Sequence, residues 1–120
     1  MTSQGTAQGR FQRALANGNL WAAETAAREL GQLPLGSALA LTALIAEVAP
    51  QRFERAAVRW HGRFVLEVPG LSIAESQLAL GAVASLRGGD RSTAVWVLGE
   101  LGAAHGAPNV TLGVRTERHD

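Results

Sequence analysis

Apolar residues recur along this chain with a helical period, and helix-breaking residues interrupt them at similar distances. The breaks are Asn17-Gly18, Pro34, Pro50, Pro69-Gly70 and Gly88-Gly89. The pattern predicts six helices, over about residues 6–16, 20–33, 35–48, 51–68, 72–87 and 90–104. Asn19, Asp90 and a capping box of Ser72 and Glu75 support three of the helix starts. We therefore expect an all-α chain.

Six helices joined by short breaks predict three antiparallel helical hairpins. Pro34 and Pro69 lie 35 residues apart, and a period near 35 is the size of a two-helix repeat. Residues 14–30, "ALANGNLWAAETAAREL", resemble the turn and second helix of a tetratricopeptide repeat. Gly18 matches the turn, Pro34 matches the closing proline, and the packing positions of the repeat fall on Ala23, Ala27 and Leu30. The tryptophan and tyrosine of the repeat's first helix are missing, so a compact six-helix bundle is the alternative fold.

Two of the predicted helices, over residues 35–48 and 72–87, are apolar on almost every side. Such helices belong in the middle of a bundle. The sequence therefore predicts a core that includes Leu39, Leu41, Leu44, Ile45, Leu78, Leu80, Val83 and Leu86.

A length of 120 residues indicates one domain. We expect the helical domain to cover residues 6–106, with flexible termini over residues 1–5 and 107–120. Within the second terminus, "NVTLGV" at residues 109–114 is the one stretch that could form a strand. No apolar signal segment or membrane-spanning run is present in the sequence, so we expect a cytoplasmic protein with no membrane contact.

Arginines alternate with aromatic residues in "QRFERAAVRWHGRF", residues 51–64. On a helical wheel Phe53, Ala57, Trp60, Phe64 and Val68 share one side, which predicts a core face. The opposite side carries four arginines, which we call the arginine row: Arg52, Arg55, Arg59 and Arg63. We expect this row to point outward.

The arginine row has three possible explanations: a solvated helix face, a surface for an acidic protein, or a surface for nucleic acid. Arginine suits bidentate contacts with carboxylates and phosphates equally. The whole chain carries a formal charge of only +1, with 11 basic and 10 acidic residues. Four phosphate contacts are few for a nucleic-acid site, so an acidic protein is the stronger functional expectation.

Two tryptophans occupy outward positions on their helices. Trp96 lies opposite the apolar face of the sixth helix, and Trp21 lies opposite Ala23 and Ala27 on the second. Exposed tryptophan is typical of interface anchors. We expect Trp96 and Trp21 to contact a protein partner or a second copy of the chain, unless a neighbouring helix covers them.

Chemistry-bearing motifs are missing from this sequence. It has no cysteine and only three histidines, His61, His105 and His119, which are too scattered for a metal pair. We expect no enzyme activity, no cofactor and no metal. The favoured function is a non-enzymatic protein–protein interaction module, adaptor or regulatory, that uses the arginine row and the outward tryptophans. The alternatives are a small nucleic-acid-associated regulator and a self-assembling structural protein; exposure of the two apolar helices would support self-assembly.

Overall fold

The structure is a computed structural model that describes residues 5–114. Its helices are α1 (Ala7–Asn17), α2 (Leu20–Leu30), α3 (Leu35–Val48), α4 (Phe53–Glu67), α5 (Ile73–Ala84) and α6 (Arg91–Ala104), and a short 3₁₀ turn, η1 (Pro50–Arg52), leads into α4. No strand forms between residues 5 and 114. The predicted all-α class with six helices is therefore confirmed.

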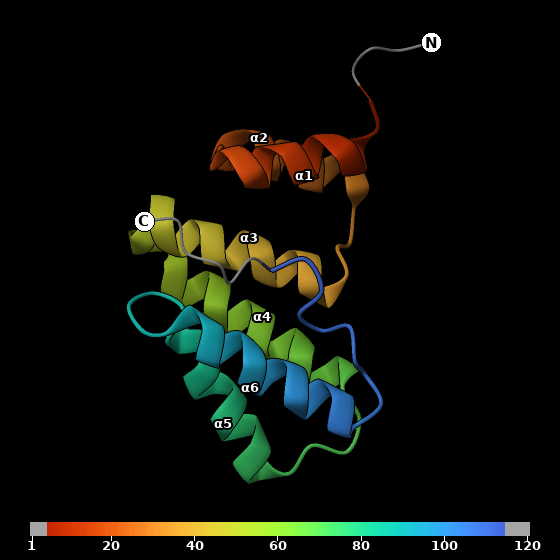
Figure 1. Ribbon diagram of the computed structural model, residues 1–120, viewed down its shortest axis with the longest axis vertical. Helices are drawn as coiled ribbons and strands as arrows, with labels where there is room; N and C mark the ends of the chain where they lie inside the picture. The colour runs from red at the N-terminus through yellow and green to blue at the C-terminus, as the bar shows by residue number, and fades with distance from the viewer. Residues whose placement is uncertain (1–4, 115–120) are drawn as a thin grey trace.

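Consecutive helices pack against one another. Helix α1 pairs with α2, α3 with α4, and α5 with α6, while α2 against α3 and α4 against α5 join the pairs. The first pair lies at one end of an elongated molecule, α3 and α4 fill its middle, and α5 and α6 form the other end (Figure 1). Three hairpins stacked in chain order are what the spacing of the helix breaks predicts.

The helix boundaries follow from capping chemistry. The side chains of Thr6, Asn19 and Asp90 each accept a hydrogen bond from a backbone N–H in the first turn. Ser72 and Glu75 form the predicted capping box. At the end of α1, Gly18 takes a left-handed conformation with φ of 68°, which other residues adopt only at a cost.

The aromatic side of α4 lies at the centre of the core. Phe53, Ala57, Trp60, Phe64 and Val68 are all buried, so the predicted core face is confirmed. The Trp60 ring stacks on the Phe64 ring with their centres 5.2 Å apart. Its indole Nε1 donates a hydrogen bond of 2.9 Å to the Leu35 carbonyl at the start of α3. This bond ties α4 to α3 and pairs the buried indole N–H of Trp60.

The prediction that both apolar helices lie in the middle holds for α3 only. Leu39, Leu44 and Ile45 are buried, and Leu41 is partly buried. Helix α5 instead lies at the end of the molecule, where α4 and α6 cover one side of it. Val83 and Leu86 are buried as predicted.

Leu78 and Leu80 were wrongly predicted to be buried, since they are 54% and 42% exposed. An apolar sequence makes burial favourable, but it supplies no neighbouring helix to provide it.

Residues 107–114 pack against α6 and α3. Val110 is buried, and the Leu112 backbone lies so close to α3 that a Cβ on Gly36 would be 2.2 Å from the Leu112 carbonyl oxygen. A Cβ on Gly102 of α6 would be 2.5 Å from the Ala107 carbonyl oxygen. The flexible terminus predicted from the sequence begins at residue 107. Its described part packs in turns and forms no strand, while residues 115–120 lie outside the described residues.

Truncating a leucine to alanine should cost much more stability in α3 than in α5. Leu44→Ala removes a buried side chain and should cost about 2–5 kcal/mol of unfolding free energy. Leu78→Ala removes one that is half exposed and should cost less than about 1 kcal/mol. Urea denaturation of dilute protein, followed by circular dichroism, measures both. Equal losses would contradict the position of α5.

Adding a methyl group to Gly36 should displace the segment that follows α6. Gly36→Ala is expected to cost about 1–3 kcal/mol, because the new group would overlap the Leu112 backbone. The matched control is Gly81→Ala on α5, where no atom lies within 4 Å of an added Cβ. That change should stabilise the chain by about 0.5–1 kcal/mol through helix propensity. Thermal unfolding of the two variants would show shifts of opposite sign.

Candidate functional site

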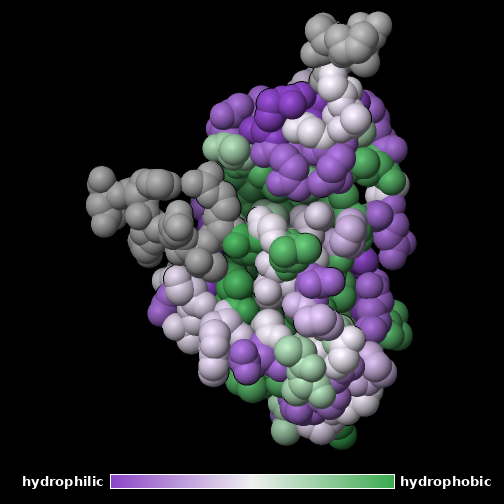
Figure 2. All heavy atoms as spheres, turned by 45° about the vertical axis from the view of Figure 1, so that its right-hand side comes forward, coloured by the Kyte–Doolittle hydropathy of each residue, from purple (hydrophilic) through white to green (hydrophobic). Residues whose placement is uncertain are grey.

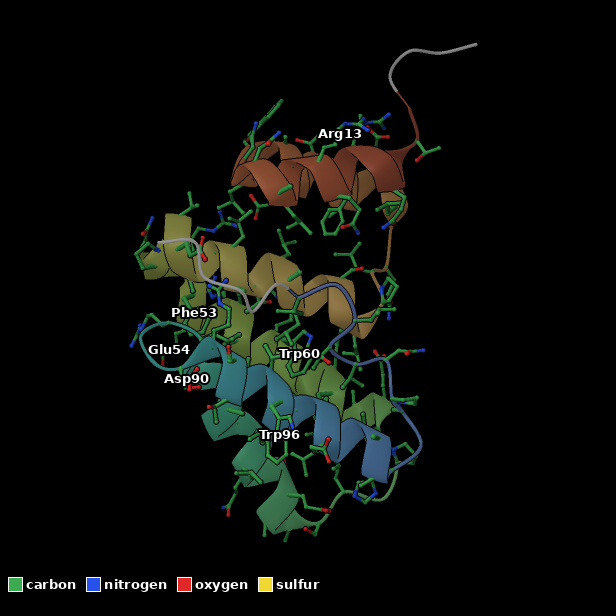
Figure 3. The ribbon with its side chains drawn as sticks, viewed as in Figure 1. Arg13, Phe53, Glu54, Trp60, Asp90 and Trp96 are labelled. Carbon is green, nitrogen blue, oxygen red and sulfur yellow. The ribbon has the colours of Figure 1, made fainter. Side chains whose placement is uncertain are left out.

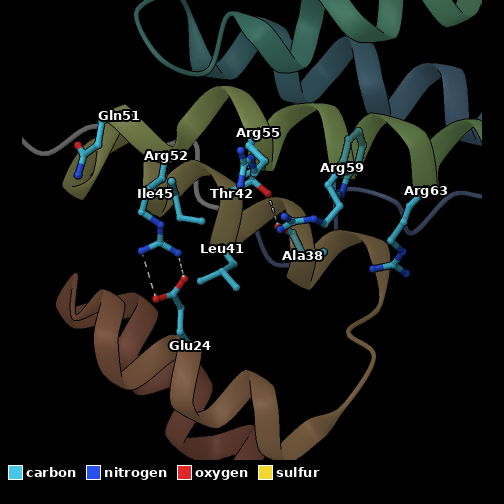
Figure 4. A pocket seen from close by; sticks show the side chains of 12 residues that line it. Glu24, Ala38, Leu41, Thr42, Ile45, Gln51, Arg52, Arg55, Arg59 and Arg63 are labelled. Atoms are coloured by element: carbon cyan, nitrogen blue, oxygen red, sulfur yellow. Dashed lines mark hydrogen bonds and ion pairs between the residues drawn. The ribbon is translucent and has the colours of Figure 1, made fainter.

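The arginine row lines a cleft. The four arginines lie along one side of η1 and α4, about one helical turn apart, and their guanidinium groups extend toward α2 and α3 (Figure 4). Arg52, Arg55 and Arg59 are exposed, and Arg63 is partly exposed. The cleft has a volume of about 600 Å³. This is within the usual size range of ligand pockets.

The floor of the cleft is mainly apolar. Ala38, Leu41 and Ile45 of α3 line it together with Trp60 of α4. Thr42 is also present, but its hydroxyl donates to the Ala38 carbonyl one turn earlier, at 2.8 Å. The prediction that the row lies outward on one side of the helix is confirmed by the exposure of Arg52, Arg55 and Arg59. The structure adds that the row borders this apolar floor. A helical wheel orients residues around one helix and says nothing of where the next helix lies.

Two members of the row already hold a carboxylate. Arg52 forms an ion pair across the cleft with Glu24 of α2, and this partner raises the pKa of Arg52 further above its ordinary value through a hydrogen bond and charge attraction. Arg63 pairs with Glu67 on its own helix, Nε to Oε2, at 2.7 Å. The i,i+4 spacing of Arg63 and Glu67 predicts that second pair from the sequence.

The two middle members have no such partner. Arg55 and Arg59 make no hydrogen bond or ion pair with any residue between 5 and 114. They lie one turn apart, which is about 6 Å along a helix. Two adjacent guanidinium groups above an apolar floor have the chemistry to hold an anionic group attached to an apolar body.

Trp21 and Trp96 are exposed to 73% and 65%, as their wheel positions predict. Neither lines the cleft. Trp21 lies on α2 and Trp96 on α6, whereas Trp60 is buried on α4 (Figure 3 labels Trp60 and Trp96). The structure therefore does not gather the predicted partner-binding residues into one surface. Only the four arginines share a site, and the contact roles of Trp21 and Trp96 stay predictions.

A second polar cluster joins the two ends of the last hairpin. His105 Nε2, just after α6, lies 3.1 Å from Glu75 Oε1 in the first turn of α5. The Glu75 carboxylate also accepts from the Ser72 backbone N–H at 2.9 Å. These contacts, the Ser72 bond first and His105 next, lower the pKa of Glu75 below its ordinary value. The capping box predicted the Ser72 contact, whereas sequence spacing contained no signal for the His105 contact.

The described residues 5–114 contain no group of three or more potential metal ligands. None of their helices combines the length and apolar character needed to cross a membrane. Comparisons with protein-family models, with curated proteins and with solved structures find no match for this chain.

Acid should weaken the last hairpin through Glu75. Because its folded pKa is lowered from 4.5, its charged form stabilises the fold at neutral pH, and this contribution is lost as pH falls through the folded pKa. Glu75→Gln should therefore melt at a lower temperature than the native chain at pH 7, and the difference should shrink as pH drops below about 4.5.

Thermal melts over a pH series measure this effect. The matched control is Glu54→Gln, which removes an exposed carboxylate with no ion-pair partner among residues 5–114. Its difference from the native chain should stay small and nearly constant with pH. A Glu75→Gln difference that did not change with pH would contradict the assignment.

Proposed function

We propose that this chain is a non-enzymatic protein-interaction module whose cleft between α2, α3 and α4 binds an acidic segment of a partner protein. One observation carries the proposal: Arg55 and Arg59 lie side by side over an apolar floor, and neither has a carboxylate partner among the described residues. Guanidinium groups bind carboxylates in a bidentate manner, and an adjacent apolar surface strengthens such a contact by excluding water.

Glu24 already illustrates how the row holds a carboxylate. It reaches from α2 across the cleft and pairs with Arg52, the first member of the row. A ligand carboxylate approaching from the same side would meet Arg55 and Arg59 in the same manner. Arg52 and Arg63, at the two ends of the row, thus pair with carboxylates of the chain itself. The two arginines in the middle stay available to a ligand.

The geometry defines what a ligand needs. Two carboxylates about 6 Å apart would match the one-turn spacing of the free arginines. An aliphatic side chain next to them would cover Leu41 and Ile45 on the floor. An acidic amphipathic helix presents both features on one side. The stacked hairpins support this use, since tetratricopeptide-like repeats form extended surfaces for partner segments.

A nucleic acid fits the cleft less well. Its affinity depends on many phosphate contacts, and only two guanidinium groups are free in the cleft. The apolar floor offers a phosphate chain no polar contact, and the negative charges of Glu24 and Glu67 beside the row would repel it.

The experiment uses a labelled helical peptide with two glutamates one turn apart and a leucine beside them. Fluorescence anisotropy should show saturable binding to the native chain. The Arg55→Gln plus Arg59→Gln variant should bind about tenfold more weakly or worse, since charged hydrogen bonds contribute about 1.5–3 kcal/mol each. Its unfolding free energy should change by less than about 1 kcal/mol, because both side chains are exposed.

The matched control is Arg28→Gln plus Arg87→Gln, which removes the same charge from exposed positions outside the cleft. It should bind the peptide almost as the native chain does. Equal weakening by both double variants would show attraction by overall charge and would sink the proposal. Tighter binding of a single-stranded oligonucleotide, with a steep loss on adding salt, would establish the nucleic-acid alternative instead.

A further inference from the structure

The outer side of α5 is an uncharged surface at the end of the molecule. Its exposed residues are Ile73, Ala74, Gln77, Leu78, Leu80, Gly81 and Ala84. Gln77 is the one polar residue among them. No ionic side chain belongs to this surface, which we call the α5 face: Glu75, the one charged residue of α5, is partly buried and bonds to the Ser72 N–H and to His105. A charged partner would therefore lose its hydration on the α5 face without gaining a counterion.

The α5 face is large for an unused surface. Ile73 is 81% exposed, and Leu78 and Leu80 are about half exposed. Trp96 projects from the outer side of α6, the helix paired with α5 (Figure 3). Ile73, Leu78 and Leu80 together expose roughly 300 Å², which is within the range of the largest apolar patch on a typical monomer. With the small residues between them, the surface approaches the roughly 600–800 Å² per partner that a stable interface buries.

The two ends of the hairpin stack differ in character. Helical-hairpin stacks require polar outer faces at both ends to stay apart in water. Here α1 supplies such a face, with Gln8, Gln12, Arg13 and Asn17 exposed. In Figure 2 hydrophilic residues gather over the top of the molecule, where α1 and α2 lie. The opposite end has no equivalent, because α5 is apolar. End-to-end stacking of α5 on α1 would bury polar groups against an apolar surface, so head-to-tail chains are excluded.

We propose that the α5 face binds the α5 face of a second copy in a two-fold dimer. An apolar surface without charge complements itself, which a two-fold axis requires. The two α5 helices are expected to lie antiparallel, because their helix dipoles then oppose each other. A parallel arrangement would place like ends of the two dipoles together. Trp96 then lies at the rim of the contact.

The dimer is independent of the cleft, because α2, α3, η1 and α4 line the cleft and no residue of α5 or α6 contributes to it. Each copy therefore keeps its own free Arg55 and Arg59. A partner with two acidic segments would bind a dimer far more tightly than a single copy through effective concentration. If the peptide does not bind, the dimer proposal still stands. If the chain does not dimerise, the proposed binding in the cleft still stands.

Sedimentation equilibrium of the full chain tests the dimer. The native chain should show a monomer–dimer equilibrium that depends on concentration. Leu78→Arg, at the middle of the α5 face, should shift the dissociation constant upward by at least a hundredfold, because it buries two charges facing each other. Ala74→Arg is a second variant on a fully outward position and should act in the same direction without disturbing the core.

The matched control is Leu66→Arg on α4, which changes a leucine that is 86% exposed and lies off the α5 face. It should leave the equilibrium unchanged. Because the chain has no cysteine, Leu78→Cys should form a disulfide-linked dimer under mild oxidation, whereas Leu66→Cys should not. A native chain that stays monomeric at every concentration, or equal effects of Leu66→Arg and Leu78→Arg, would overturn the proposal.

Discussion

Burial of the aromatic side of α4 is the constraint on which the other helices depend. Trp60 and Phe64 stack at the centre of the core, and the indole Nε1 of Trp60 needs a partner because it is buried. The Leu35 carbonyl at the start of α3 supplies that partner. With α3 fixed on one side of α4 and α5 on another, the arginine row is left on a side where solvent can enter.

The cleft is a consequence of this arrangement. The same helix contributes buried aromatics to the core and arginines to the surface, so Trp60 reaches the floor while Arg55 and Arg59 form the wall. Long arginine side chains cover apolar surface with their methylene groups and keep their charge at the edge. A site that combines charge with an apolar floor needs no specialised loop. It needs only two adjacent helices whose side chains differ in length.

The outer helices at the two ends of the stack differ in how polar their solvent-facing sides are. At the amino-terminal end α1 is amphipathic, so its second side is hydrated and polar. At the other end α5 is apolar nearly all round, and its neighbours α4 and α6 cover only one side. Residues 107–114 do not cover it either, because they turn back toward α3, where Gly36 leaves space for the Leu112 backbone. The proposed dimer would supply the missing neighbour from a second chain.

Local information was sufficient for the helices, their caps and the core side of α4. These features depend on residues within one or two turns of each other, such as Ser72 with Glu75 or Arg63 with Glu67. The sequence also identified the arginine row and the outward positions of the tryptophans, since one helical period decides them. Only the tertiary structure decided that Leu78 is exposed, that Glu24 meets Arg52 and that His105 meets Glu75. Each of these depends on the packing of helices distant in sequence, and the pattern of a single helix contains no information about its neighbours.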